Sequence, residues 1–159
     1  MRTASSGGFT LIEIMMVVAI LGLTLTMSIP SFNHMMHREG LRKTERDMVE
    51  ACQAARRAAI LGNSDVYLII RPQDHTFNVP GAFDAVTIPA DVSIDVLGIN
   101  FNSLETADEA RVKFTGKGTS DEFMILLHGP DGAYVTIYLD CVTALVRVEN
   151  RAFDPYKRE

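Results

Sequence analysis

The sequence predicts an α+β fold in which one long N-terminal helix packs on a C-terminal antiparallel β-sheet. Three observations predict it: an apolar run opens the chain, apolar residues keep helical spacing to residue 61, and short strand-like segments separated by turn signals follow Asn63. The 159 residues suit one domain of ordinary composition, with 47% hydrophobic and 22% charged residues.

Composition also excludes several function classes. A net charge of −5 argues against a general nucleic-acid binder, so DNA is not an expected partner. Two cysteines are too few for a disulfide framework and lack the close spacing of a zinc site. The sequence contains no nucleophile elbow, phosphate loop or metalloprotease motif. We therefore expect no catalytic residue, no metal and no cofactor, and a protein that is not an enzyme.

The apolar run predicts a membrane anchor. Residues 14–29 carry no charge and would span about 24 Å as a helix, whereas residues 9–29 would span about 31 Å and match a hydrocarbon core of about 30 Å. A cleaved secretory signal places small residues after its apolar run, but here they precede it at positions 4–8. A buried core helix is the other alternative, although a wholly apolar run of this length is unusual in a small soluble domain. Residues 9–29 are therefore predicted to be transmembrane, with a topology that charge counting leaves open.

Glu13 is the one formally charged side chain between Arg2 and Arg38. A carboxylate near the middle of a bilayer costs roughly 2.5–3.5 kcal/mol. One interpretation places Glu13 at the headgroups, where it caps the start of a helix. The other requires a cationic partner, such as the amine that cleavage before Phe9 would create.

The segment Gly8-Phe9-Thr10-Leu11-Ile12-Glu13, followed by the apolar run and Pro30, resembles the class III signal of type IV pilins and type II secretion pseudopilins. The resemblance implies that residues 1–8 are a leader, that prepilin peptidase cuts between Gly8 and Phe9, and that Phe9 is then N-methylated. It also implies a single-pass inner-membrane protein with a periplasmic globular part. In such filaments the anchor helices bundle, and Glu13 would meet the N-terminal amine of a neighbour.

Pro30 either ends the apolar segment or kinks a helix that continues. The next stretch favours an amphipathic continuation over residues 30–61, because it holds no further proline and only one glycine, Gly40. Gly62-Asn63 is a stop signal. The predicted apolar side of this stretch consists of Leu41, Met48, Cys52, Ala55 and Ala59.

Residues 63–159 are predicted to form a β-rich globular domain. Turns are expected at 115–120 and 129–132 because of their glycines and proline. Strands are expected at 66–70, 86–88, 92–97, 112–114, 123–127, 133–139 and 142–149, the last ones as an antiparallel meander.

A narrower resemblance covers about residues 40–150. The helical stretch 46–61, the strand after it and the later series of strands are similar to the H-type (GspH-like) minor pseudopilins of type II secretion and to the FimT/FimU minor pilins. The family often has a Thr-Gly turn before its last strand, whereas here Thr143 precedes Ala144.

This resemblance implies a minor subunit of a periplasmic pseudopilus that drives protein export. The implied partners are other pseudopilins or pilins through a helix bundle, prepilin peptidase, an inner-membrane assembly platform and membrane lipid. The alternative is a minor type IV pilin that acts in pilus priming or DNA uptake.

The remaining candidate residues each have two interpretations. His34 and His37 lie one helical turn apart and would either share a metal or be interfacial polar residues. His75 and His128 have no catalytic motif near them. Cys52 and Cys141 would form a disulfide, which is permitted outside the inner membrane, or would be two small buried residues. The basic end would contact DNA or be a solvated surface; it comprises Arg147, Arg151, Lys157 and Arg158.

Overall fold

The computed structural model describes residues 10–130 and 132–151, and of residues 25–38 it describes the backbone alone. The chain divides into two compact units, Met1–Met36 and His37–Glu159. One helix, α1 (Leu11–Gly62), runs through both units, and its bounds agree closely with the predicted 9–61. The backbone stays helical through Pro30, so continuation of the helix past this proline is confirmed.

The C-terminus of α1 ends in a Schellman motif. Asn63 has a positive φ of 45° and donates its N–H to the Ile60 carbonyl at 3.3 Å. The Ser64 N–H then bonds to the Ala59 carbonyl at 3.2 Å. These two bonds satisfy carbonyls that the helix end leaves open, and asparagine tolerates the left-handed conformation that the motif requires. The predicted stop at Gly62-Asn63 is therefore confirmed.

The β domain contains two antiparallel sheets instead of the single predicted sheet. The first has the order β3-β2-β1-β6 and the second the order β5-β4-β7-β8-β9. The first comprises β1 (Val66–Arg71), β2 (Thr76–Val79), β3 (Phe83–Thr87) and β6 (Ala110–Phe114). The second comprises β4 (Ser93–Ile99), β5 (Asn102–Ser103), β7 (Phe123–His128), β8 (Tyr134–Leu139) and β9 (Val146–Glu149).

The sheets separate because β6 pairs back onto β1. Val66 lies opposite Phe114, and the predicted turn at 115–120 then leads the chain to the second sheet. In the second sheet β7, β8 and β9 form the predicted meander, while β4 pairs with the free edge of β7. The alternation of apolar residues identifies strands, but it does not say which strands pair with each other. The division into two sheets could therefore not be predicted from the sequence pattern.

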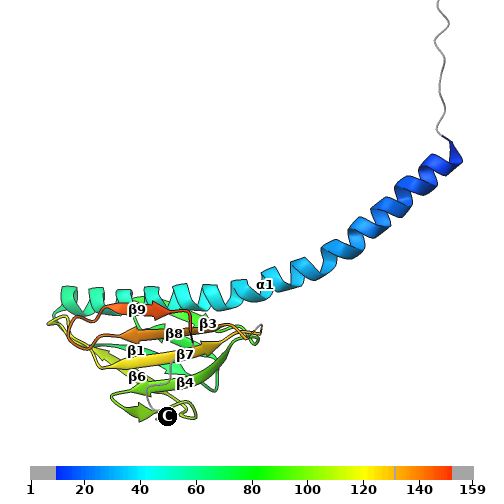
Figure 1. The fold of residues 1–159 in the computed structure, drawn as a ribbon. Helices are drawn as coiled ribbons and strands as arrows, with labels where there is room; N and C mark the ends of the chain where they lie inside the picture. The colour runs from blue at the N-terminus through cyan, green and yellow to red at the C-terminus, as the bar shows by residue number, and fades with distance from the viewer. Residues whose placement is uncertain (1–9, 131, 152–159) are drawn as a thin grey trace, which may run out of the picture. The chain divides into compact units, whose positions relative to one another are not determined.

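Both sheets share one core with the C-terminal part of α1. All five residues of the predicted apolar side of the helix are buried, together with Phe77, Phe114 and Phe123 from the strands. Figure 1 shows this part of α1, coloured cyan, lying along the strands of the β domain. The 3.6-residue period of the helix thus places one stripe of small and medium apolar side chains on the sheets.

The last strand starts later than predicted, at Val146 and not at 142, because Asp140 organises a turn. Its Oδ1 accepts hydrogen bonds from the Val142 N–H at 3.1 Å, the Thr143 N–H at 2.8 Å and the Thr143 hydroxyl at 2.9 Å. These bonds, chiefly those from Thr143, lower the pKa of Asp140. Ala144 follows with a positive φ of 49°.

Candidate functional site

The candidate site is the N-terminal segment of α1, and Thr10 starts it. The Glu13 N–H donates to the Thr10 hydroxyl at 3.3 Å and to the Thr10 carbonyl at 3.1 Å. Thr10 is therefore the N-cap, and Glu13 is the acidic residue of the first turn, where the helix dipole favours a carboxylate. The sequence analysis missed this role of Thr10, although the spacing Thr-x-x-Glu is the signature of a capping box.

The first turns of α1 expose apolar side chains in every direction around the helix. Leu11 is 82% exposed and Ile12 is 76% exposed, and even Val17 is 47% exposed. Large exposed residues occupy successive helical positions, so no polar face remains to contact water. They are Leu11, Ile12, Ile14, Met15, Met16, Val17, Val18, Ile20, Leu21 and Leu23. An apolar surface of this kind marks contact with a membrane or with another protein.

The polar side chain of Thr24, in the same segment, is satisfied within the helix. Its hydroxyl donates to the Ile20 carbonyl at 3.1 Å and to the Leu21 carbonyl at 2.9 Å. Internal bonds of this kind remove the need for water around a hydroxyl. The segment is thus compatible with an apolar environment on all sides.

Other predicted elements of this site lie outside the described residues. Gly8 and Phe9, the predicted cleavage junction and methylation position, belong to residues 1–9. The Pro30 side chain, with those of His34 and His37, belongs to residues 25–38, of which only the backbone is described. Among the described residues, no helix meets the length and hydropathy needed to cross a membrane.

The two cysteines are free thiols, so the disulfide considered from the sequence is not formed. Cys52 lies in the core between α1 and the strands, and burial raises the pKa of its thiol to about 12. Cys141 is exposed in the turn that Asp140 organises. The alternative of two buried residues is therefore correct for Cys52 and wrong for Cys141.

His75 and His128, the histidines whose side chains the structure describes, both lie in the β domain. His128 stacks on Tyr134 with ring centroids 4.4 Å apart, and its Nδ1 lies 3.7 Å from the Asp95 carboxylate. His75 forms the turn between β1 and β2 with a φ of 51°, and its carbonyl accepts the Ile88 N–H at 2.7 Å. Within residues 10–24, 39–130 and 132–151, no group of three potential metal ligands occurs.

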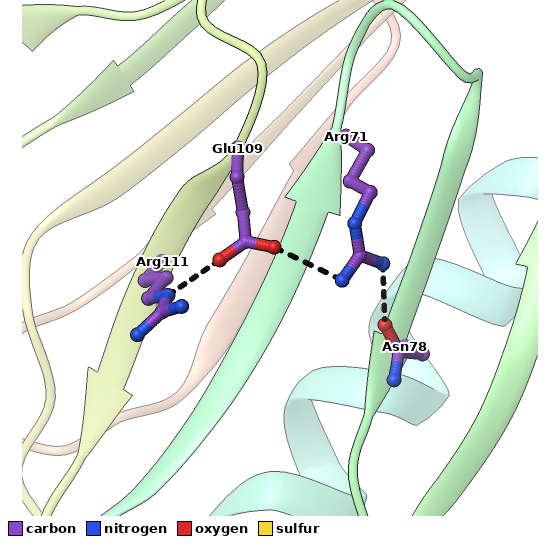
Figure 2. A network of polar contacts seen from close by, with 4 residues as sticks. All are labelled: Arg71, Asn78, Glu109 and Arg111. Carbon is purple, nitrogen blue, oxygen red and sulfur yellow. Dashed lines mark hydrogen bonds and ion pairs between the residues drawn. The ribbon is translucent and has the colours of Figure 1, made fainter.

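A polar network ties together the ends of β1, β2 and β6. Glu109 accepts from Arg111 at 2.6 Å and pairs with Arg71 at 2.9 Å, and Arg71 also donates to the Asn78 side chain at 3.3 Å (Figure 2). The hydrogen bond from Arg111, with the charges of both arginines, lowers the pKa of Glu109. Because both arginines are held by one carboxylate, we interpret the network as a brace for the first sheet.

An open groove of about 710 Å³ lies between α1 and the second sheet. Leu41, Tyr134 and Val135 are among its apolar lining residues, and Arg42, Arg46 and Arg151 line it with Glu45, which is the one acidic residue among the lining residues that the structure describes. Arg151 belongs to the basic end noted in the sequence, but the two helix arginines do not. Arg151 pairs with Glu149 at 2.7 Å, so the groove combines apolar side chains with a partly neutralised basic lining.

The comparisons with known proteins concern the N-terminal segment. Residues 3–29 match the family model described as the prokaryotic N-terminal methylation motif. No curated protein and no solved structure matches the chain. The matched residues include Gly8, Phe9 and the start of the exposed apolar helix with Glu13. The chain therefore carries, at residues 3–29, the N-terminal methylation signal of the type IV pilin and pseudopilin class.

Proposed function

We propose that the protein is a minor pseudopilin of a type II secretion system, of the H-type, with a structural and not an enzymatic role. It is inserted in the inner membrane with the β domain in the periplasm. Prepilin peptidase cuts it between Gly8 and Phe9 and methylates Phe9, and the mature subunit joins a periplasmic pseudopilus that drives protein export. The observation that carries this proposal is the methylation motif at the head of a helix whose N-terminal segment exposes apolar side chains on all sides.

Glu13 is the proposed assembly residue. It lies in the first turn of α1, close to where the new amine of Phe9 would be, and the following residues are apolar. In a bundle of such helices the carboxylate of an entering subunit meets the amine of its neighbour. An unpaired charge in an apolar medium is costly, so the pair favours entry only in the correct register.

The test replaces Glu13 by Ala or by Gln, which keeps the size of the side chain but removes its charge. We expect normal insertion and cleavage with both variants and poor filament assembly or secretion. The matched control is Thr10→Ala, which removes the helix cap at a cost of about 1 kcal/mol and leaves the charge. If Glu13→Gln assembled as well as the unchanged protein while Thr10→Ala failed, Glu13 would serve only the helix start.

The second candidate is a minor type IV pilin that captures DNA. The three arginines around the groove favour it. Binding of the full chain in detergent to duplex DNA, measured at two salt concentrations, tests it. A steep loss of affinity with salt would support DNA capture, because phosphate contacts release counterions. Equal and weak binding at both concentrations would leave the secretion role as the better proposal.

A further inference from the structure

Strand β7 is apolar on both of its faces. An antiparallel strand with one face in water usually alternates apolar and polar residues. β7 instead begins with five successive apolar residues, Phe123 to Leu127, and all five are buried. Such a run is typical of a strand that is covered on both sides. The core that the sheets share with α1 accounts for one side of β7, so the other side needs a second cover.

The second cover is needed over Met124 and Leu126. Phe123, Ile125 and Leu127 belong to the shared core and define the inner face of the second sheet. Met124 and Leu126 point to the opposite side, because successive side chains of a strand alternate between the two faces. They are only 4% and 5% exposed, yet neither belongs to the core that the described residues form. Both are therefore buried on the face of the sheet that lies away from α1.

Neighbouring side chains of β8 are buried on the same face. Thr136 lies opposite Leu126 and Tyr138 opposite Met124, and these four residues define the outer face of the second sheet. Thr136 is 0% exposed. The hydroxyl oxygen of Tyr138 is buried too, although a tyrosine that projects from a sheet normally keeps its polar tip in water. The outer face is therefore shielded over two adjacent strands.

The chain turns onto the outer face after β9. This strand ends at Glu149, which lies opposite Thr136. Two residues later, the Arg151 carbonyl accepts a hydrogen bond from the Thr136 hydroxyl at 2.6 Å. Because that hydroxyl belongs to the outer face, the backbone at Arg151 lies over β8 on this face. The last described residue thus directs the chain from β9 across β8 toward β7.

The residues that follow Arg151 can supply an aromatic cover. Their sequence is Ala152-Phe153-Asp154-Pro155-Tyr156. Neighbouring strands lie about 4.8 Å apart, and two residues extend a chain by at most about 7 Å. The chain is therefore long enough to bring Phe153 over β7. Pro155 has no N–H for a ladder hydrogen bond, which favours a segment that lies across the strands over one that extends the sheet.

We propose that residues 152–156 cross the outer face of the second sheet and that Phe153 packs on Met124 and Leu126. The segment then closes a face that would otherwise present contiguous apolar side chains to neighbouring proteins. The occupant is a segment of the same chain, so the contact forms within one subunit. It does not depend on the proposed role in secretion.

The experiment measures how fast a thiol reagent reaches the outer face. It uses full chains in detergent micelles, with Cys141→Ser to remove the exposed thiol and Leu126→Cys as the reporter. We expect slow labelling of the reporter, and at least tenfold faster labelling when Phe153→Ala is added. Lys157→Ala is the matched control and should leave the rate unchanged. Cys52, which is buried in the shared core, should stay unlabelled in every folded variant.

A second measurement does not rely on the reporter cysteine. The chain contains no tryptophan, so Phe153→Trp introduces a single fluorophore. We expect its emission to be blue-shifted relative to that of the unfolded chain and to be shielded from iodide. Emission typical of a solvated indole would overturn the proposal, even if Leu126→Cys prevented folding.

The labelling outcomes separate this inference from the proposed function. Protection of the reporter that needs Phe153 and is independent of protein concentration supports the contact. Equal labelling with and without Phe153, or an equal increase with Lys157→Ala, overturns it. Protection that is lost on dilution also overturns it, because the cover would then come from another molecule. Failure of cleavage after Gly8 would remove the proposed function and leave this contact unaffected.

Discussion

At the scale of single residues, the structure shows side chains in positions that local preference alone would not choose. Phe101 and Ala144 both have positive φ, where an L side chain with a Cβ is strained. Ala144 is buried, so the packing of its methyl group partly offsets the energetic cost of its strained backbone. Phe101 is 75% exposed, so it gains little of this packing from the part of the chain that the structure describes. This difference makes Phe101 the position where removal of the side chain should relieve strain at the smaller loss of packing.

Replacing Phe101 by glycine should stabilise the isolated chain. Glycine adopts the left-handed conformation without penalty, so we expect the free energy of unfolding to rise by about 1 kcal/mol. Thermal unfolding of the full chain in detergent measures this. Val142→Gly is the matched control, because Val142 is also exposed but has no positive φ; it should leave stability unchanged or lower it. A lower melting temperature for Phe101→Gly would show that the phenylalanine stabilises its own fold.

The cysteines should differ sharply in reactivity. Burial raises the pKa of Cys52 to about 12, so its reactive thiolate is scarce at neutral pH, whereas Cys141 is exposed. We expect a thiol reagent to label one cysteine per native chain and both after denaturation. Cys141→Ser should abolish native labelling. Absence of any labelling in denatured, non-reduced protein would instead reveal a disulfide.

At the scale of elements, the join between α1 and the turn after β6 depends on the absence of a side chain. A Cβ at Gly116 would lie 2.7 Å from the Asn63 carbonyl carbon and 2.9 Å from the Ser64 nitrogen. Both are backbone atoms of the Schellman motif that ends α1, so moving either atom would disrupt the hydrogen bonds of that motif. We expect Gly116→Ala to destabilise the β domain by about 1–3 kcal/mol. Urea unfolding measures this, and Lys117→Ala should change stability by less than about 0.5 kcal/mol.

The brace of the first sheet should make stability depend on pH. The pKa of Glu109 is lowered in the folded chain, so its contribution is present above the ordinary glutamate pKa of about 4.3 and is lost as the pH falls through the folded value. Glu109→Gln should therefore lower stability at pH 7 and have little effect at strongly acidic pH. Glu105→Gln, outside the network, is the control. An equal loss at both pH values would contradict a charge-based brace.

The helix was predictable from the sequence to within two residues at each end, and the sheets were not. The apolar period, the Gly62-Asn63 stop and the glycine-rich turns are local signals. β2 (Thr76–Val79) and β5 (Asn102–Ser103) were missed because they are only four and two residues long, too short to show an alternating apolar pattern. The arginine-lined groove also escaped prediction, since Arg42, Tyr134 and Arg151 come together only when α1 packs on the second sheet.

At the scale of the whole molecule, the chain combines two kinds of surface with separate roles. The N-terminal segment of α1 has exposed apolar side chains and carries the methylation signal. The β domain buries most of its large apolar side chains in one core with the C-terminal part of α1, and its surface is mainly charged and polar. We infer that the first surface supports membrane insertion and helix bundling, and that the second determines which neighbour a subunit accepts.

The central claim is that processing exposes a new amine next to Glu13 at the head of this helix. The most direct measurement is the intact mass of the protein purified from membranes of a cell that has a prepilin peptidase. We expect the mass of residues 9–159 plus one methyl group, placed on Phe9 by fragmentation, and the full-length mass when Gly8 is replaced. A product that retains Met1, or one that begins well beyond Phe9, would contradict the account.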